Sequence, residues 1–231
     1  MPFNANSLSS GVNKILRSRI QRINLPDTNG CVCYQKYNLC NNILNELKKY
    51  LDRLLALSTA DWKVFSDLFA EAALTKNEYF AVEGRIETRV AFLTDGVVRA
   101  FYRNKEGIEY NKTFFEPYEF IGAYTSLITG QPNQINFQAL TDCRLLATDY
   151  VNITSLYDKH PMLERFSRLT AEYFFVIKEK REIELVLLDA SQRYEIFKSE
   201  HPTLENKIPQ YHIASYLGIT PTQLSRIRAK K

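Results

Sequence analysis

The chain has 231 residues, of which 45% are hydrophobic and 24% are charged, values ordinary for a globular protein with a core of its own. No apolar run approaches the roughly 20 residues needed to cross a bilayer, and the N-terminus lacks the apolar core of a signal peptide. Four cysteines, unevenly spread, do not make a disulfide framework in a chain of this size. These features predict a cytoplasmic protein with reduced thiols.

The net charge of +4 is unevenly distributed along the chain. Residues 207–231 contain five Lys or Arg and no Asp or Glu, and residues 1–40 carry +4. Since the whole chain is +4, residues 41–206 carry −5. A basic end on an acidic body is typical of a module that binds the phosphates of a nucleic acid.

Residues 1–40 are rich in Asn and Ser and contain Gly and Pro breakers, which predicts a poorly ordered N-terminal extension. Its cysteines, Cys31, Cys33 and Cys40, are spaced C-x-C and then six residues apart. Cluster-binding loops usually space their first ligands C-x2-C or wider, and no histidine lies nearby. The sequence therefore predicts no metal site here, and the role of the extension stays open.

Helical and strand patterns then alternate. Residues 41–57 have apolar side chains at helical spacing, and Ser58 or Thr59 can cap a second helix. Further on, short runs rich in β-branched and aromatic residues alternate with turn residues, and an Asp-Gly pair at 95–96 and Lys-Glu-Gly at 105–107 predict hairpin turns. Several short strands at such spacing predict an antiparallel barrel or sandwich.

The longest predicted helix runs over residues 161–188. It carries an apolar seam over several turns, and such a seam either packs on the barrel or pairs with a second copy of itself. The side chains expected at a dimer contact are Phe166, Leu169, Tyr173, Val176 and Ile177.

Residues 208–231 predict two short helices with a tight turn between them. Pro209 suits the first turn of a helix, and Gly218 supplies the positive φ that a sharp turn between helices needs. Thr220 can cap the second helix, with Pro221 at its first position. This is the helix-turn-helix pattern, whose second helix enters a DNA major groove. The residues expected to contact DNA are Thr220, Thr222, Gln223, Ser225, Arg226 and Arg228.

In this order of elements, the chain from about residue 43 onward resembles the Crp/Fnr family of bacterial transcription regulators. The most specific stretch is IASYLGITPTQLSRIR, in which Arg226 falls where the family carries an Arg that reads guanine. The segments VAFLTDGVVRAFYRNKEG and YEFIGAYTSLITGQPNQINFQALTDC resemble the family as well.

The resemblance implies an α+β fold with an N-terminal cyclic-nucleotide-binding-like antiparallel β-barrel (a jelly roll), a long dimerisation helix and a C-terminal helix-turn-helix. The last is of winged-helix type with the wing missing, because the chain ends soon after the second helix. The expected division is an extension at 1–40, a sensor barrel with flanking helices at 41–160, the dimerisation helix at 161–188, and the DNA-binding domain at 189–231.

The barrel departs from the family at its ligand site. Cyclic-nucleotide members use a Glu for the ribose and an Arg followed by Ser or Thr for the phosphate, and here those positions hold Ala123, Asn133 and Gln134. A cyclic phosphate without a cation would leave a buried charge unpaired, so cyclic AMP is not expected as a ligand. The candidate pocket for another effector is Phe114, Phe120, Gly122, Ala123, Tyr124, Asn133, Gln134 and Phe137, with ordinary core packing as the alternative for the aromatic side chains.

The family's oxygen sensors bind an iron–sulfur cluster through N-terminal cysteines and one cysteine in the barrel. The N-terminal spacing here departs from that pattern. Cys143 falls at a strand position where a buried structural cysteine is expected. The sequence therefore predicts no iron–sulfur cofactor.

The main hypothesis is a homodimeric, sequence-specific DNA-binding transcription regulator. Its partners would be double-stranded DNA, a second copy of the chain and RNA polymerase, and no membrane. One alternative is a small-molecule-binding module of the cyclic-nucleotide fold without DNA readout, and another is a redox or iron–sulfur sensor. An enzyme is not expected, because the sequence contains no Ser-His-Asp set, P-loop or dinucleotide loop.

Overall fold

The computed structural model describes residues 32–229, with side chains from residue 43 onward. Helix α2 spans Val32–Leu54, so ordered structure begins before the predicted boundary at residue 41. No Gly or Pro interrupts this stretch, and a helix, once nucleated, propagates until a breaker stops it. Cys33 and Cys40 lie within α2, whereas Cys31 lies outside the described residues. Within the described range, no helix is both long and apolar enough to cross a bilayer.

Two four-stranded antiparallel sheets form the centre of the described structure, which confirms the predicted jelly-roll barrel. One sheet has the order β1-β8-β3-β6 and the other β2-β7-β4-β5. The strands are β1 Ala70–Leu74, β2 Tyr79–Ala81, β3 Arg89–Asp95, β4 Val98–Arg103, β5 Glu109–Phe115, β6 Glu119–Gly122, β7 Asn136–Ala139 and β8 Cys143–Asp149.

The space between the two sheets is filled by apolar side chains from both of them. Phe115 and Phe137 stack at the centre, with ring centroids 5.8 Å apart. Buried residues from all the strands except β1 join them in one cluster, and Leu74 of β1 packs against it. The barrel is therefore built as a packed core.

The two predicted hairpin turns have different outcomes. The turn at 105–107 joins the paired strands β4 and β5, as predicted, and Gly107 has a φ of +81°. The turn at 95–96 joins β3 to β4, which lie in different sheets, so the hairpin prediction was wrong there. Gly96 has a φ of +93°, and a Cβ on it would lie 2.4 Å from the carbonyl oxygen of Asp142. Glycine allows the chain to cross from one sheet to the other at this corner.

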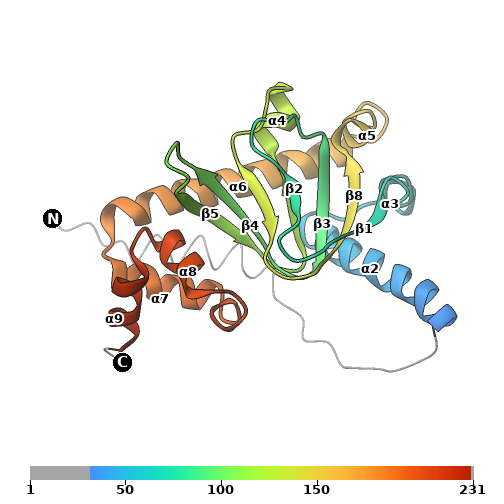
Figure 1. The fold of residues 1–231 in the computed structure, drawn as a ribbon. Helices are drawn as coiled ribbons and strands as arrows, with labels where there is room; N and C mark the ends of the chain where they lie inside the picture. The colour runs from blue at the N-terminus through green and yellow to red at the C-terminus, as the bar shows by residue number, and fades with distance from the viewer. Residues whose placement is uncertain (1–31, 230–231) are drawn as a thin grey trace.

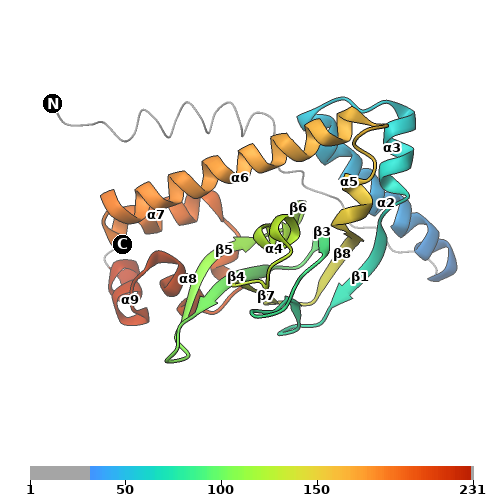
Figure 2. The ribbon, with the colours of Figure 1, turned by 90° about the horizontal axis from the view of Figure 1, so that it is seen from above.

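Helix α6, Pro161–Leu187, runs along one side of the barrel and connects the two ends of the molecule (Figures 1 and 2). At one end lie α2, α3 (Thr59–Ser66, capped by Ser58) and α5 (Tyr150–Thr154), while α4 (Tyr124–Thr129) lies between β6 and β7. Phe166 of α6 is buried in a cluster with Phe65 and Phe120. It is therefore a contact with the chain's own barrel, and the prediction that it faces a second copy was wrong.

The C-terminal module lies at the other end of α6, against β4 and β5 (Figure 2). It consists of α7 Ala190–Glu200, a 3-10 turn Leu204–Asn206, α8 Gln210–Leu217 and α9 Pro221–Ala229. Its buried side chains form a single cluster with Val97, Phe114 and Leu140 of the barrel. The module and the barrel therefore share a core.

Candidate nucleic-acid interface

Helices α8 and α9 form the predicted helix-turn-helix. Gly218 ends α8 with a φ of +68°, and its N–H donates back to the carbonyl oxygens of Ala214 and Ser215. Ile213 and Leu217 of α8 and Leu224 of α9 are buried against one another and the rest of the C-terminal cluster. The buried side of α9 is thereby fixed, and its opposite side faces outward.

Two of the six predicted DNA-contacting residues hold the first turn of α9 together. The Thr220 hydroxyl oxygen accepts from the N–H of Gln223 at 3.2 Å, and the Gln223 side-chain oxygen accepts from the N–H of Thr220 at 2.9 Å. This reciprocal pair is a capping box, which satisfies backbone donors that a helix start leaves open. The Thr220 hydroxyl and the side-chain oxygen of Gln223 thus have a structural task at the start of α9.

The other four predicted residues differ in how free their side chains are. Thr222, Ser225 and Arg226 are exposed on the outer side of α9. Arg228 is also exposed, but its Nε lies 3.1 Å from a carboxylate oxygen of Glu205, so its charge is partly compensated. The outer side of α9 therefore offers two hydroxyls and the Arg226 guanidinium group, which has no ion pair among residues 32–229 and is suited to bases and phosphates.

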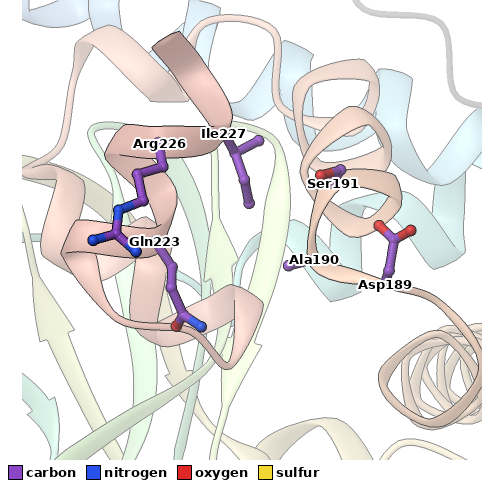
Figure 3. A pocket seen from close by; sticks show the side chains of 6 residues that line it. All are labelled: Asp189, Ala190, Ser191, Gln223, Arg226 and Ile227. Atoms are coloured by element: carbon purple, nitrogen blue, oxygen red, sulfur yellow. The ribbon is translucent and has the colours of Figure 1, made fainter. Parts of the chain in front are cut away.

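An open groove of about 300 Å³ separates α9 from the start of α7 (Figure 3). Ile227 points across it toward α7, whereas the guanidinium group of Arg226 points away from α7. Asp189 caps α7 at the edge of the groove by accepting from the N–H of Gln192 at 2.9 Å. Because this carboxylate is negative, the groove disfavours a phosphate, and the outer side of α9 is the better surface for one.

The side chains predicted to line an effector pocket are not brought together. Phe114 packs outward against the C-terminal module, and Phe120 packs outward against α6. Ala123 and Phe137 lie inside the barrel, and Tyr124 is exposed on α4. Neighbours in a strand point to opposite faces, so an aromatic run in a strand sends its side chains to different places. The predicted pocket was wrong in this respect.

The remaining predicted pocket residues serve the loop after α4. Asn133 is buried, and its side chain bonds to both the carbonyl oxygen and the N–H of Ile135. Its backbone oxygen accepts from Gly84 at 2.7 Å. Gln134 is exposed, and Gly122 has the side chain of Leu127 close by. Asn133 therefore stabilises the conformation of this loop.

Cys143 lies buried in the barrel core, as predicted for a structural cysteine. Its Sγ lies 3.2 Å from the carbonyl oxygen of Thr141, to which the thiol donates. Burial raises the pKa of the Cys143 thiol, because the charged thiolate is poorly solvated there. The thiol is thus protonated and unreactive at neutral pH.

A buried polar network between the barrel and α8 was not predicted. At its centre is Arg99 of β4, only 5% exposed, whose guanidinium group contacts Gln138, Glu109, Asn111 and the Nδ1 atom of His212. The distances to Glu109 and His212 are 2.6 and 3.2 Å. The sequence signal was an Arg between apolar residues in a predicted strand, which marks a buried charge that needs partners.

Residues 71–160, from β1 to α5, match the family of cyclic nucleotide-binding domains. No curated protein matches the chain in sequence. Among solved structures, it is similar to FixK2 from Bradyrhizobium japonicum, with a TM-score of 0.63 and 17% identity over 70% of this chain and 83% of that one. It is also similar to CLP, the c-di-GMP responsive global regulator of Xanthomonas campestris, with a TM-score of 0.61 and 13% identity over 75% and 91% of the two chains.

A third similar structure is a protein from Eubacterium rectale assigned to the Crp/Fnr family of transcriptional regulators. The TM-score is 0.60, and the identity is 16% over 75% of this chain and 83% of that one. At such identities the likeness is one of fold. Residues 71–160 of this chain are therefore similar to the cyclic nucleotide-binding domains, and the described structure is similar in fold to FixK2 and to a protein assigned to the Crp/Fnr family.

Proposed function

We propose that this chain is a homodimeric transcription regulator of the Crp/Fnr type, acting in the cytoplasm, which reads DNA with α9. The observation that carries the proposal is the arrangement of α9, whose inner side is locked by Leu224 while Thr222, Ser225 and Arg226 are exposed on its outer side. A helix held in this way can enter a major groove without breaking the packing contacts of its inner side. Contact with RNA polymerase belongs to the same proposal, since the regulators of this fold act on transcription.

Dimerisation is supported by the surface of α6. The exposed surface of α6 carries several apolar side chains, including Phe175 at 65% and Val186 at 80% exposure. Among the predicted dimer residues, Val176 and Ile177 are exposed, and Leu169 and Tyr173 are half-buried. An apolar surface of this extent is typical of an interface, and a two-fold dimer lets two α9 helices read two half-sites. The other exposed apolar residues of α6 are Phe174, Ile183, Leu185 and Leu187.

We also propose that the barrel has lost the ability to hold a cyclic nucleotide. The position of the ribose-binding Glu is Ala123, which is buried in the core cluster, and that of the phosphate-binding Arg is Asn133, which is bonded to Ile135. The packed interior also argues against the alternative of a small-molecule module without DNA readout. Calorimetric titration with cyclic AMP is expected to give no saturable heat.

The test of DNA readout is a mobility-shift assay with the chain's own promoter region at two salt concentrations. Arg226→Ala is expected to weaken specific binding by ~1–3 kcal/mol and to spare much of the non-specific binding. Arg144→Ala is a matched control, because Arg144 is exposed on β8 and the same charge is removed away from α9. Equal binding by the Arg226 variant and the unchanged chain would refute the proposal, and saturable cyclic-nucleotide binding without any DNA shift would favour the alternative.

A further inference from the structure

Helix α8 is attached to the barrel by specific hydrogen bonds, and we call this contact the joint. Helix α8 lies along β5, which is the edge strand of its sheet. The Ser215 hydroxyl accepts from the N–H of Asn111 at 2.9 Å and donates to the carbonyl oxygen of Glu109 at 3.0 Å. Edge strands carry unpaired backbone groups that usually need covering. Here a side chain of the helix-turn-helix covers them.

The second part of the joint is the Arg99 network. The guanidinium group has five N–H groups, and five contacts to Gln138, Glu109, Asn111 and His212 match them. Asn111 also donates to the backbone oxygen of His212 at 2.9 Å. A buried polar network whose members are all satisfied fixes one arrangement, because any shift would leave a buried charge or amide without a partner.

The same network determines the tautomer of His212. The Nδ1 atom faces Arg99 at 3.2 Å and the Nδ2 atom of Asn111 at 3.3 Å, and both of these groups can only donate. Nδ1 must therefore accept, which leaves the ring proton on Nε2. His212 thus ties α8 to Arg99 of β4 and Asn111 of β5 through hydrogen bonds.

Two further contacts extend the joint to α7 and α6. Glu116, which follows β5, lies 2.8 Å from Nδ1 of His201 at the end of α7. Arg181 of α6 donates to the backbone oxygen of Tyr216, and its guanidinium carbon lies 4.0 Å from the centre of the Tyr216 ring. The C-terminal module is therefore held by the barrel and by α6 at the same time.

We propose that the outer face of β4 and β5 is a seat that positions α9 for DNA, with Arg99, Asn111, His212 and Ser215 as its positioning residues. The inference rests on the proposed function. The contacts of the seat are on α7 and α8, and the outer side of α9 remains exposed, so the seat holds the reading helix without covering it. A helix fixed in advance loses less conformational freedom when it binds DNA.

The test uses the full chain and the promoter fragment of the mobility-shift assay. Asn111→Ala, His212→Ala and Ser215→Ala are each expected to weaken specific binding by about tenfold and to leave the salt dependence unchanged, because no phosphate contact is removed. Ser155→Ala is the matched control for the serine variant, since its exposed hydroxyl donates to the carbonyl oxygen of Asn152 in α5, away from the joint. It is expected to bind as the unchanged chain does.

Hydrogen exchange measured on the same proteins without DNA shows whether the joint has opened. His212→Ala is expected to raise exchange in α7, α8 and α9 and to leave β3 and β8 protected. Unchanged exchange in these helices would overturn the proposal, and so would raised exchange together with unchanged or tighter DNA binding. Failure of the proposed function gives a different result, because Arg226→Ala would then leave DNA binding unaltered while exchange still responded to His212→Ala.

Discussion

Acidification is expected to destabilise the chain through His212. Burial, and after it the charge of Arg99, lowers the pKa of His212 from the usual 6.5 to about 4, while Glu109 acts in the opposite direction. His212 is 4% exposed, and the ring of Tyr211, its neighbour on α8, has its centroid 4.1 Å from that of His212. A proton on Nδ1 would remove the acceptor that Arg99 and Asn111 use and would place two positive charges side by side.

The direction in which pH changes the stability follows from the pKa of His212 in the unfolded and in the folded chain. As the pH falls below 6.5, the unfolded chain binds a proton at this histidine, whereas the folded chain does not until about pH 4. The stability that the neutral imidazole contributes is therefore fully present above 6.5 and is lost between 6.5 and about 4. Over the whole window the loss is about 3 kcal/mol, and between about pH 7.5 and about pH 5 it is about 2 kcal/mol.

Urea denaturation of the unchanged chain and of His212→Gln at these two pH values measures the effect. Other groups titrate in both proteins and cancel in the comparison. The difference in free energy of unfolding between the two proteins is expected to shrink by about 2 kcal/mol on acidification. A difference that stays constant would show that His212 is not held neutral beside Arg99, and the reasoning about the joint would fail with it.

Three other substitutions test the packing of α9, the turn at residues 95–96 and the proposed dimer. Leu224→Ala is expected to cost about 2–5 kcal/mol in urea denaturation, because Leu224 is almost fully buried between α8 and α9. Gly96→Ala is expected to destabilise the chain more than Gly107→Ala: both have positive φ, but only at Gly96 would a Cβ meet the backbone of Asp142, and equal losses would contradict this. Val176→Glu is expected to convert the proposed dimer to a monomer in light scattering, whereas Lys178→Glu, at a site paired with Glu182 on the same helix, should not.

Features set by short stretches of sequence could be predicted well. The turn between α8 and α9 depends on Gly218 with its positive φ and on Thr220 as a cap, and both act as predicted. The long helix starts at Pro161, as predicted, and the fixed φ of proline suits a first turn. The hairpin at 105–107 is likewise a local structure.

Features that depend on distant pairing could not be predicted in this way. Strand β1 has the sequence AEAAL, which favours a helix by propensity, and it is a strand because it pairs with β8 along its whole length. The turn at 95–96 has hairpin chemistry but joins two sheets, since both edges of β3 are taken by β6 and β8. Phe114 likewise faces outward because the C-terminal module covers β5, and the local sequence does not contain this information.

The joint between the barrel and the helix-turn-helix depends both on local sequence features and on pairing between distant residues. Apart from Arg99, its polar residues carry no signal in the sequence, and only the fold shows that Arg99 and His212, 113 positions apart, share one buried network. All five N–H groups of Arg99 have protein partners, and the barrel interior beneath the network contains a buried apolar cluster. An effector shifts an equilibrium only by binding one arrangement better than another. One that acted through this barrel would have to displace packed side chains, whereas formation of the proposed dimer on α6 would respond to protein concentration alone.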